Sequence, residues 1–155
     1  MLWIPACAGM TYSWASRAPP PGHLAISFNE STVWAETLTP GVERKRLLTA
    51  GRVPRTRILL DRIRVGAGVK MALGVTPGDL VWFQMLEGEA QLTHGAARVS
   101  LGSHHIVCLP AGFSGTLTTK AGAAFLYAQL PNAERFDPDF PRRLPQFRVI
   151  DWTRE

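Results

Sequence analysis

A regular alternation of short apolar runs and turn residues between Gly68 and Leu130 is the strongest constraint on how this chain folds. Runs rich in β-branched and aromatic residues recur at intervals of roughly ten residues, each closed by a Gly, Pro, Asn or Asp signal. This spacing is typical of a small all-β sandwich or barrel. Within it, the segments LEGEAQL and LPAGFSG indicate two tight turns that need glycine, at Gly88 and Gly112.

The same pattern predicts where the strands lie. We expect strands within residues 33–38, 42–49, 56–65, 70–75, 80–86, 89–93, 96–101, 105–109, 115–119 and 123–130. The run LVWFQML at 80–86 is almost wholly apolar, so this strand is expected to be covered on both faces. Four prolines after Leu130 exclude long regular structure, apart from a turn of helix at 133–136 and a final edge strand within 147–152.

Length and composition predict one folded domain with two flanking segments. The 155 residues are enough for a single core. We expect residues 1–30 to form a poorly ordered extension, 31–130 the β-barrel and 131–155 a Pro-rich tail. No apolar run approaches the roughly 18 residues of a membrane span, so no membrane partner is expected. Cys7 and Cys108 imply no disulfide framework, which favours a cytoplasmic location.

The positive charge of the chain is concentrated in one segment. The net charge of +5 comes mainly from arginine, and seven Arg and one Lys lie between Arg44 and Arg64 with Asp61 as the single acid. Such a segment can bind nucleic acid or an anionic ligand. It can also form a solvated strand face, or a subunit contact with Asp137 and Asp139. No aromatic residues for base stacking are interleaved with the arginines, so nucleic acid is not an expected partner.

Four segments, taken in order, resemble a small single-domain cupin. They are WAETLTPGVERKRLL, RIRVGAG, VWFQMLEGEAQL and HIVCLPAGFSG, and the resemblance covers residues 33–130. The LEGE and PAG turns are its most specific parts. The resemblance implies a cupin-type jelly-roll barrel, also called a double-stranded β-helix, with a pocket at the open end. It also implies a homodimer formed by strand exchange or sheet packing.

The metal ligands of that family do not carry over to this sequence. Counted from the two turns, the resemblance places the family's carboxylate at Leu80 and its histidines at Gly74, Thr76 and Gly115. A catalytic divalent site needs about three nitrogen or oxygen ligands, and a lone threonine hydroxyl is a poor one. A shift of one residue brings Asp79 near the carboxylate position but restores no histidine. We therefore expect no metal site and no cofactor.

The chain's four histidines do not rebuild such a site in the expected geometry. His104 and His105 are adjacent, and adjacent side chains of a strand point to opposite faces, so they are not expected to share an ion. His94 lies in the turn THGA, and His23 follows the proline run at 19–21. All four are interpreted as surface or turn residues, unless one pairs across a dimer interface.

Alternation along the strands suggests which residues line the pocket. If Gly74, Thr76 and Leu80 face inward, then Trp82 and Gln84 share that face.

Tyr127 joins this set if its side chain also points inward. Thr76, Trp82, Gln84 and Tyr127 are then the candidate ligand-binding residues, although core packing explains Trp82 and Tyr127 equally well. Aromatic walls with an amide and a hydroxyl suit binding better than bond cleavage.

Three functions are compatible with these features. The first is a metal-independent cupin that binds a small organic ligand in its barrel. The second is a cupin enzyme, an isomerase, lyase or dioxygenase, that acts on a sugar acid or small carboxylate through an unorthodox site. The third is a structural homodimer whose arginine belt meets a nucleic acid or protein partner. No nucleophile elbow or phosphate loop is present, and we expect Cys108 to have a raised pKa that disfavours nucleophilic attack.

Overall fold

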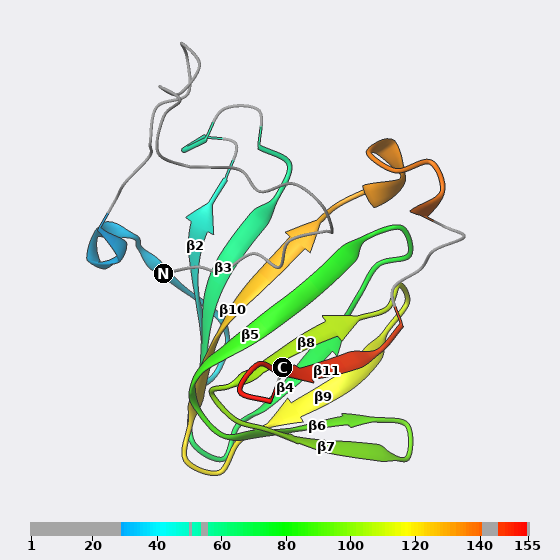
Figure 1. Ribbon diagram of the computed structural model, residues 1–155. Helices are drawn as coiled ribbons and strands as arrows, with labels where there is room; N and C mark the ends of the chain where they lie inside the picture. The colour runs from blue at the N-terminus through cyan, green and yellow to red at the C-terminus, as the bar shows by residue number, and fades with distance from the viewer. Residues whose placement is uncertain (1–28, 50, 54–55, 141–145, 155) are drawn as a thin grey trace.

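The computed structural model describes residues 29–49, 51–53, 56–140 and 146–154, and the regular secondary structure of these residues is almost entirely β-strand (Figure 1). Two short 3₁₀ turns, η1 (Glu30–Thr32) and η2 (Ala133–Arg135), flank the barrel strands. The strands are β1 (Ala35–Thr39), β2 (Val42–Leu48), β3 (Leu59–Val65), β4 (Lys70–Gly74), β5 (Leu80–Gly88), β6 (Ala90–His94), β7 (Ala97–Leu101), β8 (His105–Leu109), β9 (Ser114–Thr118), β10 (Ala123–Leu130) and β11 (Arg148–Asp151).

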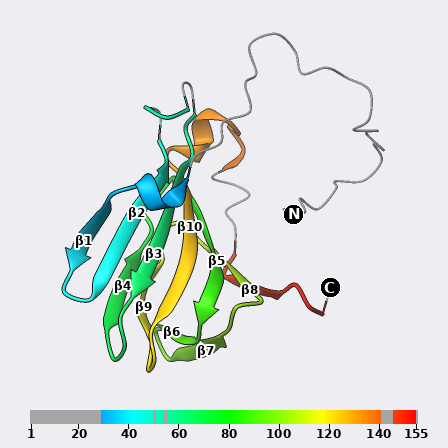
Figure 2. The ribbon, with the colours of Figure 1, turned by 90° about the vertical axis from the view of Figure 1, so that its left-hand side faces the viewer.

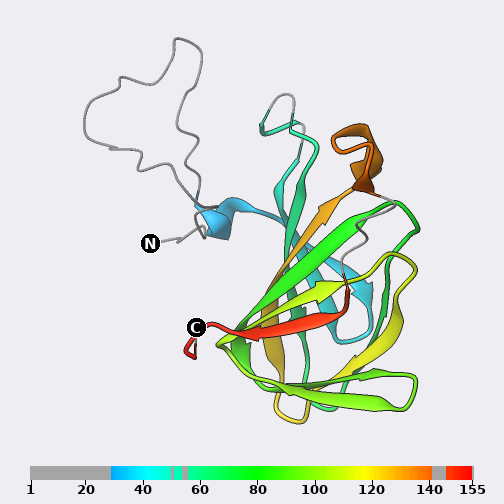
Figure 3. The same cartoon turned by 45° about the vertical axis from the view of Figure 1, so that its right-hand side comes forward.

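The strands form two antiparallel sheets that curve around one interior. The large sheet has seven strands in the order β1-β2-β3-β10-β5-β8-β11, and the small sheet has four in the order β4-β9-β6-β7. The chain crosses repeatedly between the sheets, so strands distant in sequence become neighbours. The two layers are visible in the rotated views (Figures 2 and 3). This is the all-β, cupin-type jelly-roll barrel that the sequence predicts.

Apolar side chains from both sheets fill the space between them. On β5, Phe83 and Met85 are fully buried, and Phe125 of β10 packs beside them with its ring centroid 5.1 Å from that of Phe83. Leu92 and Leu117 approach from the small sheet and are equally buried. Burial of these large side chains, at roughly 1.5–3 kcal/mol each, is the main force that holds the two sheets together.

The two glycine turns expected from the sequence are present. Gly88 and Gly112 adopt positive φ angles of 74° and 71°, a backbone region that costs side-chain-bearing residues energy. At Gly88 a Cβ atom would also collide with the carbonyl oxygen of Gly122. Gly88 therefore serves both the turn and the close approach of the loop before β10.

The strand positions largely follow the expected ranges, with one difference in burial. The β5 strand was expected to be covered on both faces, yet its outer face is only half-buried while its inner face is fully buried. Beyond the barrel, β11 pairs with β8 at the edge of the large sheet, and η2 lies within the predicted turn of helix. Residues 1–28 of the expected extension lie outside the described residues.

No helix in the described ranges is long and apolar enough to cross a membrane.

We expect Gly88→Ala to lower the free energy of unfolding by about 2 kcal/mol or more, because it adds both a strained φ and a backbone collision. Gly95→Ala is the matched control. Gly95 also has a positive φ, 56°, but its Cβ would meet no atom within 4 Å, so about 1 kcal/mol should be lost. Urea unfolding measures both, and equal losses would contradict the proposed role of the Gly122 contact.

Candidate functional site

The barrel interior is apolar where the resemblance predicted metal ligands. Gly115 faces inward, opposite Leu73 in the β9–β4 pair, and a Cβ on it would lie 2.7 Å from the ring of Phe113. The aromatic ring thus occupies the space that a histidine at 115 would need. Val75 and Val81 are also buried in the core. None of these side chains can donate to a metal ion.

The predicted inward face of β4 and β5 is wrong by one residue. Gly74 and Thr76 are exposed, and Trp82 and Gln84 lie on the outer face of the large sheet, where they are half-buried. The residues that point into the barrel are their neighbours in sequence. Strand alternation has a period of two, so an error of one position exchanges the two faces completely.

Tyr127, by contrast, points into the barrel. It lies directly opposite Phe83 of β5 and packs against the core cluster. On its other side Tyr127 is the cross-strand partner of Asp61, which in turn lies opposite Arg46 of β2. Directly opposite residues of antiparallel strands share a face, so these side chains form one inward-facing row.

The row begins with a buried ion pair. Asp61 is 5% exposed, and both its carboxylate oxygens accept hydrogen bonds from Arg46, at 3.0 Å from Nε and 3.2 Å from Nη2. A second guanidinium, that of Arg44, lies 3.9 Å away. These hydrogen bonds raise the pKa of Arg46. The two-pronged pairing compensates the cost of burying the carboxylate.

Tyr127 is a neutral hydrogen-bond donor in this setting. Burial raises its pKa to about 12, and the nearby negative charges of Asp79 and Asp61 add to the effect. Within the described part of the chain, its hydroxyl has no hydrogen-bond partner.

Asp79 ties together the loops at this end of the barrel. It is 6% exposed, and its carboxylate accepts hydrogen bonds from Gln129 Nε2 at 2.7 Å and from the backbone N–H of Asn132 at 3.1 Å. Asn132 adopts a left-handed conformation with φ 50°, and the next residue, Ala133, donates to the Gly78 carbonyl at 2.8 Å. The turn after β10 is therefore fixed to the turn before β5.

A cavity of about 380 Å³ lies beside the turn that Asp79 holds. The segment that leads into β3 and the turn at η2 form its walls, and both lie at the same end of the barrel (Figure 1). Its lining residues are Thr56, Arg57, Pro131, Asn132, Arg135 and Phe136. Among the described residues, Arg57 and Arg135 have no carboxylate partner. The cavity is therefore positively charged and has an aromatic side chain in its wall.

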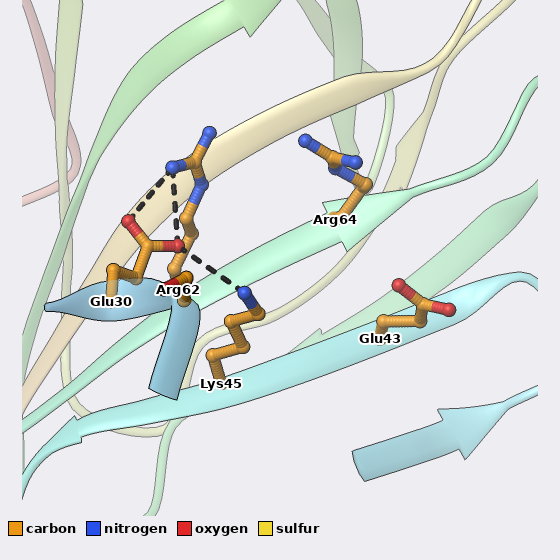
Figure 4. Close-up of a pocket in the computed structure, with 6 residues that line it drawn as sticks. Glu30, Glu43, Lys45, Arg62 and Arg64 are labelled. Carbon is orange, nitrogen blue, oxygen red and sulfur yellow. Dashed lines mark hydrogen bonds and ion pairs between the residues drawn. The ribbon is translucent and has the colours of Figure 1, made fainter. Parts of the chain in front are cut away.

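The outer face of β2 and β3 carries a second charged hollow, of about 310 Å³, in which the charges are largely paired (Figure 4). Glu30 of η1 accepts from Arg62 at 2.9 Å and lies 3.9 Å from Lys45. Arg62 also binds Glu87, at 2.5 Å. Lys45, Arg62 and Arg64 of this hollow thus lie beside carboxylates of the same domain, which weakens the case for a bound polyanion here.

A histidine pair and a carboxylate meet at the edge of the large sheet. Ligand atoms of His104, His105 and Asp151 all lie within 4.8 Å of one another. The prediction that the two histidines face apart is wrong because His104 belongs to the turn before β8, not to the strand. Their ring centroids are 4.2 Å apart.

Cys108, on the outer face of β8, is a free thiol of intermediate exposure. Burial raises its pKa, as the sequence predicted.

Sequence reasoning missed the cavity residues. Arg57 was counted only as one of the seven arginines of the basic segment, and Arg135 only as part of a short helical turn. The one available signal was Pro131-Asn132, since a turn asparagine tolerates the left-handed conformation.

Comparison with known proteins identifies the fold. No protein-family model and no curated protein matches the chain. Among solved structures, the chain is similar to a variant of Bacillus subtilis oxalate decarboxylase, with TM-score 0.58, 18% identity and 74% of this chain covered. It spans only 32%, about a third, of that longer chain.

Two further structures agree. A predicted oxalate decarboxylase from Thermotoga maritima gives TM-score 0.59 at 16% identity, covering 68% of this chain and 99% of that one. An ethanolamine utilization protein Q from Salmonella typhimurium gives TM-score 0.51 at 18% identity, covering 59% of this chain and 70% of that one. Together with the two-sheet architecture, these likenesses show that the chain has the cupin fold.

The ionisation of Tyr127 provides a test of the inward-facing row. The full chain has two tyrosines, so Tyr127→Phe isolates the signal of Tyr127 in an absorbance titration. We expect Tyr127 to ionise near 12 rather than 10. Because the folded protein retains this proton where the unfolded chain has lost it, the stability that Tyr127 contributes should fall as pH rises from about 10 to about 12. Ionisation of Tyr127 near 10 would contradict its burial between the two carboxylates.

Proposed function

We propose that this protein is a cupin-fold binding protein that holds a small organic anion at the end of its barrel, without a metal ion inside the barrel. The observation that carries this proposal is the cavity with two unpaired guanidinium groups, Arg57 and Arg135, within the described residues. Elsewhere on the barrel, Arg44, Arg46 and Arg62 each have a carboxylate partner.

The cavity has the size and chemistry for such a ligand. Its volume of about 380 Å³ falls within the range of small-molecule sites. Guanidinium groups bind carboxylates through paired hydrogen bonds, so two of them favour a carboxylate over a neutral molecule. Thr56 and Asn132 add polar groups, and the ring of Phe136 provides an apolar surface for the carbon skeleton.

The surrounding structure prepares the cavity for binding. Asn132 is held by Asp79, and Arg135 follows within the same 3₁₀ turn. A wall that is already ordered loses less entropy when a ligand binds. Leu73, Val75, Val81 and Gly115 offer no metal-ligating side chain, which supports a binding mode that needs no ion in the barrel.

The second candidate function is an enzyme that acts on a sugar acid or small carboxylate. Tyr127, a neutral proton donor close to Asp79, is the observation that favours it. Two of the similar structures are described as oxalate decarboxylases; that description applies to those two proteins and does not assign the activity to this chain. Conversion of a bound carboxylate, followed by NMR, would establish this function, and recovery of the unchanged compound would favour the binding protein.

The ligand proposal is tested with a panel of small carboxylates and sugar acids, oxalate included, using calorimetry on the full chain. Arg57→Gln and Arg135→Gln should each weaken binding of the best compound about tenfold or more, because each removes a charge-assisted hydrogen bond. Arg98→Gln, which removes a cation from β7, is the matched control and should leave the affinity unchanged.

Addition of EDTA should also leave the affinity unchanged, because the proposed site contains no ion. The proposal fails if no compound of the panel binds, or if both arginine variants bind as the unchanged chain does.

We also propose that a second copy of the chain covers the outer face of the large sheet. Leu126, Gln84, Ile106 and Ile150 lie in one row across β10, β5, β8 and β11, and all are half-buried. Trp82 and Cys108 are paired in the adjacent row. A mostly apolar face of this kind suits a two-fold contact in which the same patch serves both subunits.

Light scattering coupled to gel filtration tests the contact. The unchanged chain should be a dimer, and Ile106→Glu should be a monomer because it places charges at the centre of the apolar face. Lys70→Glu, an exposed change on β4 of the small sheet, should remain a dimer. A monomeric unchanged chain, or a dimeric Ile106→Glu variant, would exclude this interface.

A further inference from the structure

The end of β11 and the turn before β8 bring three metal-binding side chains together outside the barrel. Asp151 is the direct cross-strand partner of His105 at the end of the β11–β8 ladder. The next residue, Trp152, donates its backbone N–H to the His104 carbonyl at 3.2 Å. The backbone itself therefore fixes the carboxylate beside the two histidines.

We propose that His104, His105 and Asp151 bind a divalent transition-metal ion, with zinc as the best-suited ion. Two imidazoles and one carboxylate form a ligand set that zinc accepts, and three protein ligands leave a further coordination position for water. The site lies at the sheet edge, so it is separate from both the apolar interior and the arginine-lined cavity.

The backbone orients His105 toward this role. The turn is closed by the hydrogen bond from His105 N–H to the Gly102 carbonyl, at 3.0 Å. The Nδ1 atom of His105 accepts a hydrogen bond from the backbone N–H of Gly102 at 2.9 Å. Binding of an ion by Nε2 would move the ring proton to Nδ1, where the Gly102 carbonyl, 3.3 Å away, could accept it.

Hydrogen bonds also fix the orientation of the Asp151 carboxylate. Its Oδ1 accepts hydrogen bonds from Thr153, at 3.1 Å from the backbone N–H and 2.6 Å from the hydroxyl. The other oxygen, Oδ2, lies 3.7 Å from His104 Nε2.

The spacing is close to that of a bound ion. Bond lengths of 2.0–2.1 Å in a tetrahedral site separate neighbouring ligand atoms by about 3.4 Å. The 3.7 Å between Oδ2 and Nε2 and the 4.8 Å limit for the whole set require only small side-chain rotations. Arg154 must move away from the carboxylate: its Nε lies 3.2 Å from Oδ2, but its side chain is 85% exposed. An exposed ion pair of this kind costs little to break.

An ion at this position would join the C-terminal edge strand to the turn before β8. Any ligand that binds only the folded chain stabilises it. Zinc should therefore raise the unfolding temperature and make the detachment of β11 from β8 less frequent.

Calorimetric titration of the chelator-treated full chain with Zn²⁺ is the test. We expect one ion per chain, with binding weakened at least about tenfold in His105→Ala and in Asp151→Asn. His94→Gln, which removes a histidine outside the cluster, is the matched control and should bind as the unchanged chain does.

Circular dichroism establishes that the variants are folded, and Arg154→Gln, an exposed change, should bind Zn²⁺ at least as tightly as the unchanged chain. The proposal is overturned if the unchanged chain binds no Zn²⁺, if folded His105→Ala and Asp151→Asn bind it normally, or if Arg154→Gln binds it more weakly.

Discussion

The close packing of apolar side chains between the two sheets determines where this protein can have a functional site. Phe83, Met85 and Phe125 from the large sheet meet Leu92 and Leu117 from the small one, all fully buried. A well-packed interior leaves few voids for a ligand. Polar chemistry is accordingly found around the periphery of the barrel: at the end that carries Asp79, on the outer face of β2 and β3, and at the β8–β11 edge.

Buried carboxylates then define the polar end of the barrel. Asp61 is held by Arg46, and Asp79 by Gln129 and the Asn132 backbone, so each buried charge has found hydrogen-bond donors. Asp79 links two turns that are distant in sequence and thereby shapes one wall of the cavity. The cations near this end differ in their pairing. Arg46 forms an ion pair with Asp61, whereas Arg57 and Arg135 have no carboxylate partner in the part of the chain that the structure describes.

The sequence predicted the fold well because strand ends carry explicit signals. Gly88 and Gly112 mark turns that require positive φ, and the strands follow from the spacing between such signals. The sequence did not determine in the same way which side chains of β5 point into the barrel. LVWFQML is apolar on both faces, so neither phase of alternation was excluded, and counting from a family motif placed Trp82 and Gln84 inside.

The cavity was missed because Arg57 and Arg135 come from separate segments and meet only in three dimensions. His104 and His105 were misjudged because a turn, unlike a strand, can direct adjacent side chains to one place.

The cupin fold by itself does not decide the function, since one framework hosts unrelated chemistries at different sites. In this chain an aromatic ring and aliphatic side chains occupy the places where the related motif has ligands, while imidazole and carboxylate groups gather at a sheet edge. A metal ion at that edge and an anion at the barrel end would bind to different elements, η2 and the β3 entry on one side and β8 and β11 on the other. Because these elements belong to one cooperative domain, both ligands would stabilise the same folded state. Their effects on stability would then add, with little effect of either ligand on the affinity for the other, unless β8 and β5 shift together when an ion binds.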